Sequence, residues 1–180
     1  MYNIYIPKFH CIYCMWRKIS VYFKHFPKRR KLAQKLLEYG LKIQDNNIFC
    51  KDIELSDSKI ARAFQVDRRI ISSTIEMINE KKELKELFSR LEPTCHMINV
   101  APIMNWGVIE IIPDDPSQPG ILAEVAKVVA ESNISIRQAI VDDFEITDEP
   151  RLFIVAEKQL PGSLIPKIRN IKGVKAVVIR

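Results

Sequence analysis

The clearest hydrophobic pattern along the chain lies at residues 107–136, where two apolar stretches flank a helical repeat. Residues 108–112 are β-branched and nearly uninterrupted in apolar character, which predicts a strand covered on at least one face. Pro113 ends this strand, and a loop rich in Pro and Asp follows as far as Gly120. Apolar residues then recur at the spacing of one helix face, at Leu122, Val125, Ala126 and Val129. The pattern therefore predicts a strand, a loop and an amphipathic helix, followed by a second strand.

The second of these strands and the remainder of the chain predict the rest of the domain. Residues 134–141 alternate, residues 151–158 form a further apolar strand, and residues 174–179 form the last one, with a short helix ending at Gly173. The acidic residues 142–150 predict a hairpin loop. The order βαββαβ predicts a four-stranded antiparallel sheet with two helices on one face, the ferredoxin-like arrangement.

Residues 55–75 have the pattern of two short helices joined by a tight turn. Ser56 or Asp57 can cap the first helix, and Asp67 can cap the second. In the second helix the apolar side consists of Ile70, Ile71, Thr74, Ile75, Met77 and Ile78. The opposite side is polar and consists of Arg68, Arg69, Ser72, Ser73, Glu76 and Asn79. This pattern predicts a helix-turn-helix, although a generic helical hairpin would also carry a polar outer face.

The other elements of the first half are an amphipathic helix that ends at Gly40, a small hairpin or loop at residues 43–55, and a helix at residues 81–91. Two prolines and no clear period at residues 93–106 mark a boundary. The predicted class is α+β, with a mainly helical N-terminal domain. The predicted organisation is an N-terminal extension at 1–15, a helix-turn-helix domain at 16–92, a linker at 93–106 and a ferredoxin-like domain at 107–180.

Charge divides the chain in the same way. The whole sequence has a net charge of +6, but residues 1–100 contain 19 Lys and Arg against 11 Asp and Glu, whereas residues 101–180 contain 9 against 11. A run of four cations in the first half consists of Lys28, Arg29, Arg30 and Lys31. The excess predicts a polyanion partner for the first half, and double-stranded DNA fits the helix-turn-helix pattern. The predicted DNA contacts are this run together with Arg68, Arg69, Ser72 and Ser73.

Several function classes are disfavoured. No run of about 18 apolar residues is present to cross a membrane, and charges interrupt the first 26 residues, so we expect a cytosolic protein without a signal peptide. Cys11 and Cys14 form a CxxC pair, but no second spaced pair accompanies it, which favours structural or incidental cysteines over a metal. Met15 is a plausible alternative start that would make the first fourteen residues an extension. No catalytic set, phosphate loop or metal cluster has convincing spacing, so neither an enzyme nor a cofactor is expected.

The loop before the helix at residue 121 has a chemistry of its own. A loop that leaves a strand and opens a helix exposes backbone N–H groups at the positive end of the helix dipole, which suits a small carboxylate. The loop is therefore physically suited to an amino acid.

The second half resembles an ACT domain, the small regulatory module of amino-acid metabolism. Residues 108–112, the Pro119-Gly-Ile-Leu122 segment, the helix through Val129, residues 133–136 and Gly173-Val174 carry the resemblance. It implies a homodimer, paired through sheets or helices, that binds an amino acid at the interface. By this resemblance one wall of the site would consist of Ser117, Gln118, Gly120, Ile121 and Leu122, with Asn133 and Ser135 contributed across the interface. Ser117 departs from the Asp or Asn common at its position. The acidic residues lie earlier, at Asp114 and Asp115, and either could receive the ammonium group of the ligand.

The whole chain is similar to archaeal-type two-domain regulators that join a helix-turn-helix to an ACT domain and, more loosely, to the leucine-responsive regulators. The resemblance implies a dimeric, amino-acid-responsive transcriptional regulator that binds DNA. Two alternatives remain open. One is an ACT-type regulatory subunit that docks on an amino-acid biosynthetic enzyme, and the other is an ACT domain used only for dimerisation.

Overall fold

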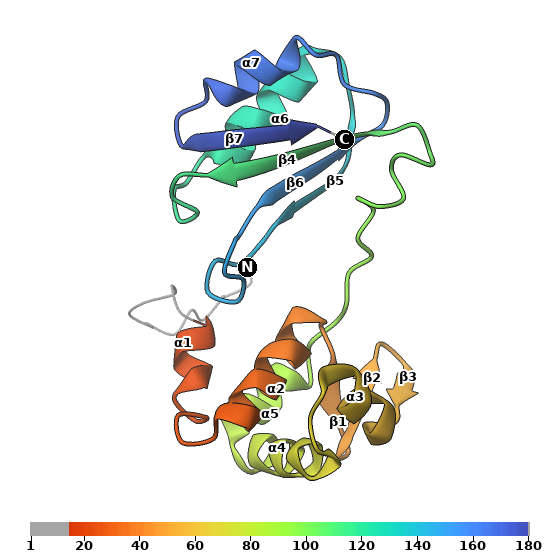
Figure 1. Ribbon diagram of the computed structural model, residues 1–180, viewed down its shortest axis with the longest axis vertical. Helices are drawn as coiled ribbons and strands as arrows, with labels where there is room; N and C mark the ends of the chain where they lie inside the picture. The colour runs from red at the N-terminus through yellow and green to blue at the C-terminus, as the bar shows by residue number, and fades with distance from the viewer. Residues whose placement is uncertain (1–14, 180) are drawn as a thin grey trace, which may run out of the picture. The chain divides into compact units, whose positions relative to one another are not determined.

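The computed structural model describes residues 15–179 and divides the chain at Thr94 into two compact units. Among the described residues, the first unit contains five helices and a small sheet, and the second contains a four-stranded sheet and two helices (Figure 1). Both sheets are antiparallel. The α+β class predicted from the sequence is therefore confirmed.

The first unit is built on a helical core. Its helices are α1 (Met15–Ser20), α2 (Pro27–Glu38), α3 (Asp57–Phe64), α4 (Arg68–Glu80) and α5 (Lys82–Phe88). Its strands are β1 (Lys42–Gln44), β2 (Asn47–Cys50) and β3 (Ile53–Leu55), which pair in the order β1-β2-β3 where a hairpin or loop was predicted. The largest fully buried side chains include Phe23, Leu32, Leu36, Ile48, Ile71, Ile78, Leu84 and Phe88. The core is thus shared by α2, α4, α5 and the sheet.

The turn between α3 and α4 contains the predicted cap at Asp67. Gln65 ends α3 in the left-handed conformation, with φ of 55°. Asp67 Oδ1 then accepts a hydrogen bond of 2.8 Å from the backbone N–H of Arg69 and caps α4. Ile71, Thr74, Ile75 and Ile78 are buried, whereas Ile70 and Met77 of the predicted apolar side are only half-buried.

The second unit has the predicted βαββαβ order. Its elements are β4 (Gly107–Pro113), α6 (Ile121–Glu131), β5 (Ile136–Val141), β6 (Leu152–Ala156), α7 (Leu164–Arg169) and β7 (Val174–Ile179). The strands lie in the order β5-β6-β4-β7, and each neighbouring pair is antiparallel. Helices α6 and α7 cover one face of this sheet (Figure 1). The buried cluster on that face includes Ile109, Ile111, Val125, Val129, Ile154, Leu164 and Ile168.

The buried stripe of α6 differs from the predicted one. The stripe consists of Ile121, Val125 and Val129, while Leu122 is 38% exposed. The helix begins at Ile121, directly after Gly120, so the first side chain of the helix is the one that docks on the sheet. Leu122 lies one residue, or about 100°, further around the helix and points away from the core.

Residues 95–106 cover part of the other face of the sheet, although the sequence pattern placed residues 93–106 in a linker. Ile98 and Ala101 are buried against Val108 of β4 and Val155 of β6. Met97, Trp106 and Phe153 pack around them. This packing makes the segment part of the second unit, which begins at Cys95.

Gly40 follows the end of α2 with a left-handed backbone conformation, and its replacement tests whether this conformation requires glycine. Its φ is +62°, and a Cβ there would meet the carbonyl oxygen of Glu92 at 2.7 Å. We expect Gly40→Ala to lower the free energy of unfolding by at least about 1–2 kcal/mol, because left-handed backbone is strained for alanine. The measurement is urea unfolding followed by circular dichroism.

The matched control is Gly162→Ala, since a Cβ at Gly162 meets nothing within 4 Å. We expect its effect to stay within about 0.5 kcal/mol. Equal destabilisation by the two substitutions would contradict the explanation.

Candidate functional site

The first candidate surface is the N-terminal half of α4. Arg68, Arg69 and Ser72 are exposed and lie within an arc of about 100° around the helix axis. We call these three residues the α4 face. Ser73, also predicted as a contact, is half-buried, and its hydroxyl donates a hydrogen bond of 3.2 Å to the carbonyl of Ile70. At the other end of the helix, Asn79 Nδ2 donates a bond of 2.7 Å to Asn46 Oδ1 in the turn between β1 and β2.

The predicted basic run occupies the first turns of α2. Lys28, Arg30 and Lys31 are exposed and Arg29 is half-buried. The two arginines lie over aromatic rings, since the Arg29 guanidinium is 4.5 Å from the ring centre of Phe26 and that of Arg30 is 5.9 Å from Trp16. Their charges are therefore held close to the protein, while the two lysines extend into solvent.

The basic run and the α4 face lie near opposite ends of α4. Tyr22, just before α2, donates a hydrogen bond of 2.8 Å to Glu83, which is in the first turn of α5. Because α5 follows directly after α4, this bond places the start of α2 near the end of α4. The 13 residues of α4 span about 20 Å, at 1.5 Å per residue. The first unit thus presents cations at both ends of α4.

The second candidate site is a cavity of about 120 Å³ beside the loop that joins β4 to α6. Four of the residues predicted to hold an effector line it, namely Gln118, Gly120, Ile121 and Leu122. Gly120 has φ of +96°, and a Cβ there would meet nothing within 4 Å. No side chain caps the start of α6, so the N–H groups of its first turn face the loop without a side-chain acceptor.

The other predicted residues of this loop stabilise the loop itself. Asp115 Oδ1 accepts hydrogen bonds from the Ser117 hydroxyl at 2.6 Å and from the Ser117 backbone N–H at 2.9 Å. These bonds lower the pKa of the Asp115 carboxyl. Neither residue lines the cavity, and neither does Asp114, whose backbone N–H donates to the carbonyl of Gly173 at 2.9 Å. Gln118 Nε2 donates to the carbonyl of Lys172 at 3.2 Å, which anchors the loop to the turn before β7.

Asn133 and Ser135 lie at the opposite end of α6 from this loop. The helix has 11 residues and is about 16 Å long. Asn133 is left-handed, and its carbonyl accepts a bond of 3.1 Å from Lys158 Nζ. The backbone N–H of Ser135 donates to Glu157 Oε1 at 3.2 Å. Within one chain they therefore do not meet the loop, and their contribution from a second chain stays a prediction.

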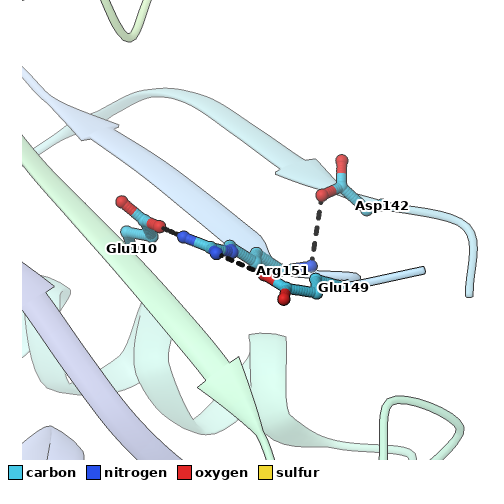
Figure 2. Close-up of polar contacts among 4 residues, drawn as sticks. All are labelled: Glu110, Asp142, Glu149 and Arg151. Carbon is cyan, nitrogen blue, oxygen red and sulfur yellow. Dashed lines mark hydrogen bonds and ion pairs between the residues drawn. The ribbon is translucent and has the colours of Figure 1, made fainter. Parts of the chain in front are cut away.

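The sequence interpretation missed a polar group on the face of the sheet that the helices leave uncovered. The Arg151 cluster consists of Glu110, Asp142, Glu149 and Arg151 (Figure 2). One guanidinium nitrogen, Nη1, donates to the Glu110 carboxylate, and the other, Nη2, donates to Glu149 at 2.9 Å. The Arg151 backbone N–H donates to Asp142 Oδ2 at 3.1 Å. The Glu110 and Glu149 carboxylates raise the pKa of Arg151, because their hydrogen bonds and negative charge favour the guanidinium form.

Glu110 itself is only 1% exposed although it lies on the central strand β4. A single acidic residue inside an otherwise apolar strand was the available signal that a cation must lie nearby. Arg151 and Asp142 also line the cavity beside the β4–α6 loop. Two further cavities, of about 450 and 290 Å³, are lined by both Arg151 and Glu149. Three cavities therefore meet at this cluster.

Residues 15–179 were compared with the patterns of a metal site and of a membrane span. In that range no three His, Cys, Asp or Glu side chains are grouped to hold an ion, and Cys50 and Cys95 are free thiols. Cys11 and Cys14, the predicted non-metal pair, lie outside the described residues. No helix within the same range is long and apolar enough to cross a bilayer.

The chain is similar to solved structures but to no family model or curated protein. Among solved structures the chain is similar to the crystal structure of an AsnC family transcriptional regulator from Agrobacterium tumefaciens. That match has 13% sequence identity and a TM-score of 0.28, and it covers 85% of this chain and 86% of the other.

The contact between Arg151 and Glu110 predicts that removal of the guanidinium lowers the stability of the second unit. We expect Arg151→Met to lower the urea midpoint of unfolding clearly, because the Glu110 carboxylate then stays buried without that cation. Glu149→Gln removes the exposed contact and should change the midpoint little. Adding Glu110→Leu to Arg151→Met should recover most of the loss, because both partners are then apolar. A double variant as unstable as Arg151→Met would show that the pair is not the cause.

Proposed function

We propose that this protein is a DNA-binding transcriptional regulator whose second unit responds to an amino acid. The observation that carries the proposal is the α4 face, Arg68, Arg69 and Ser72, at the start of a capped helix that follows a tight turn. Residues 1–94 also hold the whole excess of positive charge, since residues 95–100 have no charged side chain. A basic unit with an exposed helix of this kind fits the helix-turn-helix mode of DNA binding.

The geometry of α4 suits a DNA groove. The major groove is about 12 Å wide and admits an α-helix, and arginine at the start of such a helix can donate two bonds to guanine O6 and N7. Lys28 and Lys31 extend near the other end of α4, where they could neutralise phosphates without reading sequence. The two groups of cations therefore have different roles, with the α4 face specifying the site and the lysines adding affinity.

The second unit supplies a candidate effector site of the ACT type. Its cavity lies beside the uncapped start of α6, and its walls include the apolar side chains of Ile111, Ile121, Leu122, Val141 and Leu152. The helix N-terminus would attract the carboxylate of an amino acid. The apolar walls favour an amino acid with an apolar side chain.

Regulation would require two copies of the chain and two arrangements of them. Paired helices must meet half-sites about 34–36 Å apart, so a change in the dimer changes the fit to DNA. An effector shifts the balance only if its affinity differs between the two arrangements. In this proposal the amino acid bound by the second unit supplies that difference.

The DNA-binding part predicts a loss of affinity on removal of the α4 arginines. We expect the protein to retard DNA from upstream of its own gene at low salt, and Arg68→Ala with Arg69→Ala to weaken binding at least tenfold. The control is Lys167→Ala with Arg169→Ala on α7, which removes the same charge from an exposed surface of the second unit. Mobility-shift titrations at several salt concentrations measure both. No binding by the wild-type chain at any low salt concentration would reject the function.

The effector part predicts a ligand-dependent rise in thermal stability. A ligand at 100 times its dissociation constant stabilises a fold by about 2.7 kcal/mol, so one of the twenty amino acids should raise the melting temperature. Leu122→Glu should abolish this rise, because a carboxylate at the cavity wall repels that of the ligand. The control is Ile165→Glu on α7, since Leu122 is 38% and Ile165 37% exposed. A flat response to all twenty would favour a domain used only for dimerisation.

A further inference from the structure

The strap, residues 95–106, is held to the second face of the sheet by specific contacts at both of its ends. At its start, Gln138 Nε2 donates to the carbonyl of Cys95 at 2.6 Å, and Gln138 Oε1 accepts from the backbone N–H of Met97 at 2.9 Å. At its end, the Arg137 guanidinium lies 4.6 Å from the ring centre of Trp106, and Gln159 Nε2 donates to the Trp106 carbonyl at 3.2 Å. The Gln138 side-chain amide thus forms two hydrogen bonds with the strap backbone, one as donor and one as acceptor, as the backbone of a neighbouring strand would.

A β-bulge puts Gln138 in position for this. Ile136 pairs with Ala156 on the helix-covered face, and regular alternation would put Gln138 on the same face. The pairing instead shifts between these residues, so Gln138 pairs with Val155 and faces the strap. An extra residue in an edge strand re-aims every side chain that follows it. The bulge therefore turns the Gln138 amide, which supplies both the acceptor and the donor, toward the strap.

The strap is only partly packed. Its buried apolar contribution is Ile98 and Ala101, whereas Val100, Ile103 and Met104 on its outer side are exposed, Ile103 by 83%. His96 and Asn99 of the strap and the Arg151 cluster of the sheet line one open cavity of about 290 Å³. Polar groups on both walls of one cavity mean that whatever occupies it contacts the strap and the sheet together.

We propose that the strap is releasable, that Gln138 holds it, and that its attachment sets the length of the tether between the two units. The tether is short while residues 95–106 lie on the sheet. Twelve released residues would span about 20 Å on average as a flexible chain and about 40 Å when extended. The release of the strap does not depend on the proposed function. Its effect on DNA binding rests on that function, because a longer tether in a dimer would relax the spacing at which two DNA-binding units meet their half-sites.

The test uses the full chain and needs neither DNA nor effector. Gln138→Leu keeps the side-chain bulk and removes both hydrogen bonds, and Gln44→Leu makes the same change at an exposed position of β1. Hydrogen exchange measured by mass spectrometry reports the strap amides, and small-angle scattering at equal oligomeric mass reports the maximum dimension. We expect Gln138→Leu to speed exchange in residues 95–106 at least tenfold, to leave β4 and β6 within twofold, and to lengthen the particle by about 10–20 Å. Gln44→Leu should do none of these.

If hydrogen exchange in the strap is unchanged in Gln138→Leu, Gln138 does not hold the strap. If exchange is faster but the maximum dimension of the particle is unchanged, attachment of the strap does not set the length of the tether. If Gln138→Leu instead loosens the whole second unit, Gln138→Glu at neutral pH decides the matter. That variant keeps the acceptor for Met97 and loses the donor to Cys95, so its effect should be intermediate and confined to the strap. Loosening of β4 and β6 in that variant too would show that residues 95–106 are an integral part of the core and not a strap.

Discussion

The buried carboxylate of Glu110 is the constraint on which the second unit depends. A charge on the central strand of a sheet is tolerated only with a cation and further polar groups around it, and Arg151 meets that need from the start of β6. Glu149 and Asp142 contact Arg151 in turn, at its side chain and at its backbone. The loop from β5 to β6 is therefore held at both ends, next to the cavity that includes the start of α6.

This constraint gives the two faces of the sheet different characters. The helix-covered face is a continuous apolar core, and three of its side chains, Ile111, Ile121 and Leu152, also line the cavity beside the start of α6. The other face combines the Arg151 cluster, two cavities and a thin cover made by the strap. Elements that move in a regulator come from weakly packed regions, and this face has that property whereas the helix face does not. Arg151 and Asp142 connect this face to the cavity beside the start of α6, because both residues line that cavity.

The first unit rests on short-range chemistry. The left-handed Gln65 and the Asp67 cap set the direction in which α4 leaves the turn, and the bond from Asn79 to Asn46 fixes the far end of the helix. These contacts hold α4 at both of its ends. In the proposed function this would favour DNA binding, because side chains that are already placed lose less entropy on binding.

Local signals in the sequence determined most of the elements. The cap at Asp67, the end of α2 at Gly40, the start of α6 after Gly120 and the order βαββαβ all follow from residues close together in the chain, so the sequence alone sufficed for them. The resemblance to an ACT domain assigned Gln118, Gly120, Ile121 and Leu122 to one site, and these four residues line one cavity. Tertiary structure alone decided that Arg151 meets Glu110, 41 residues away, and that Gln138 faces residues 95–97. Both pairings depend on strand register, and a single bulged residue reverses the face of every side chain that follows it, which no periodic pattern in the sequence records.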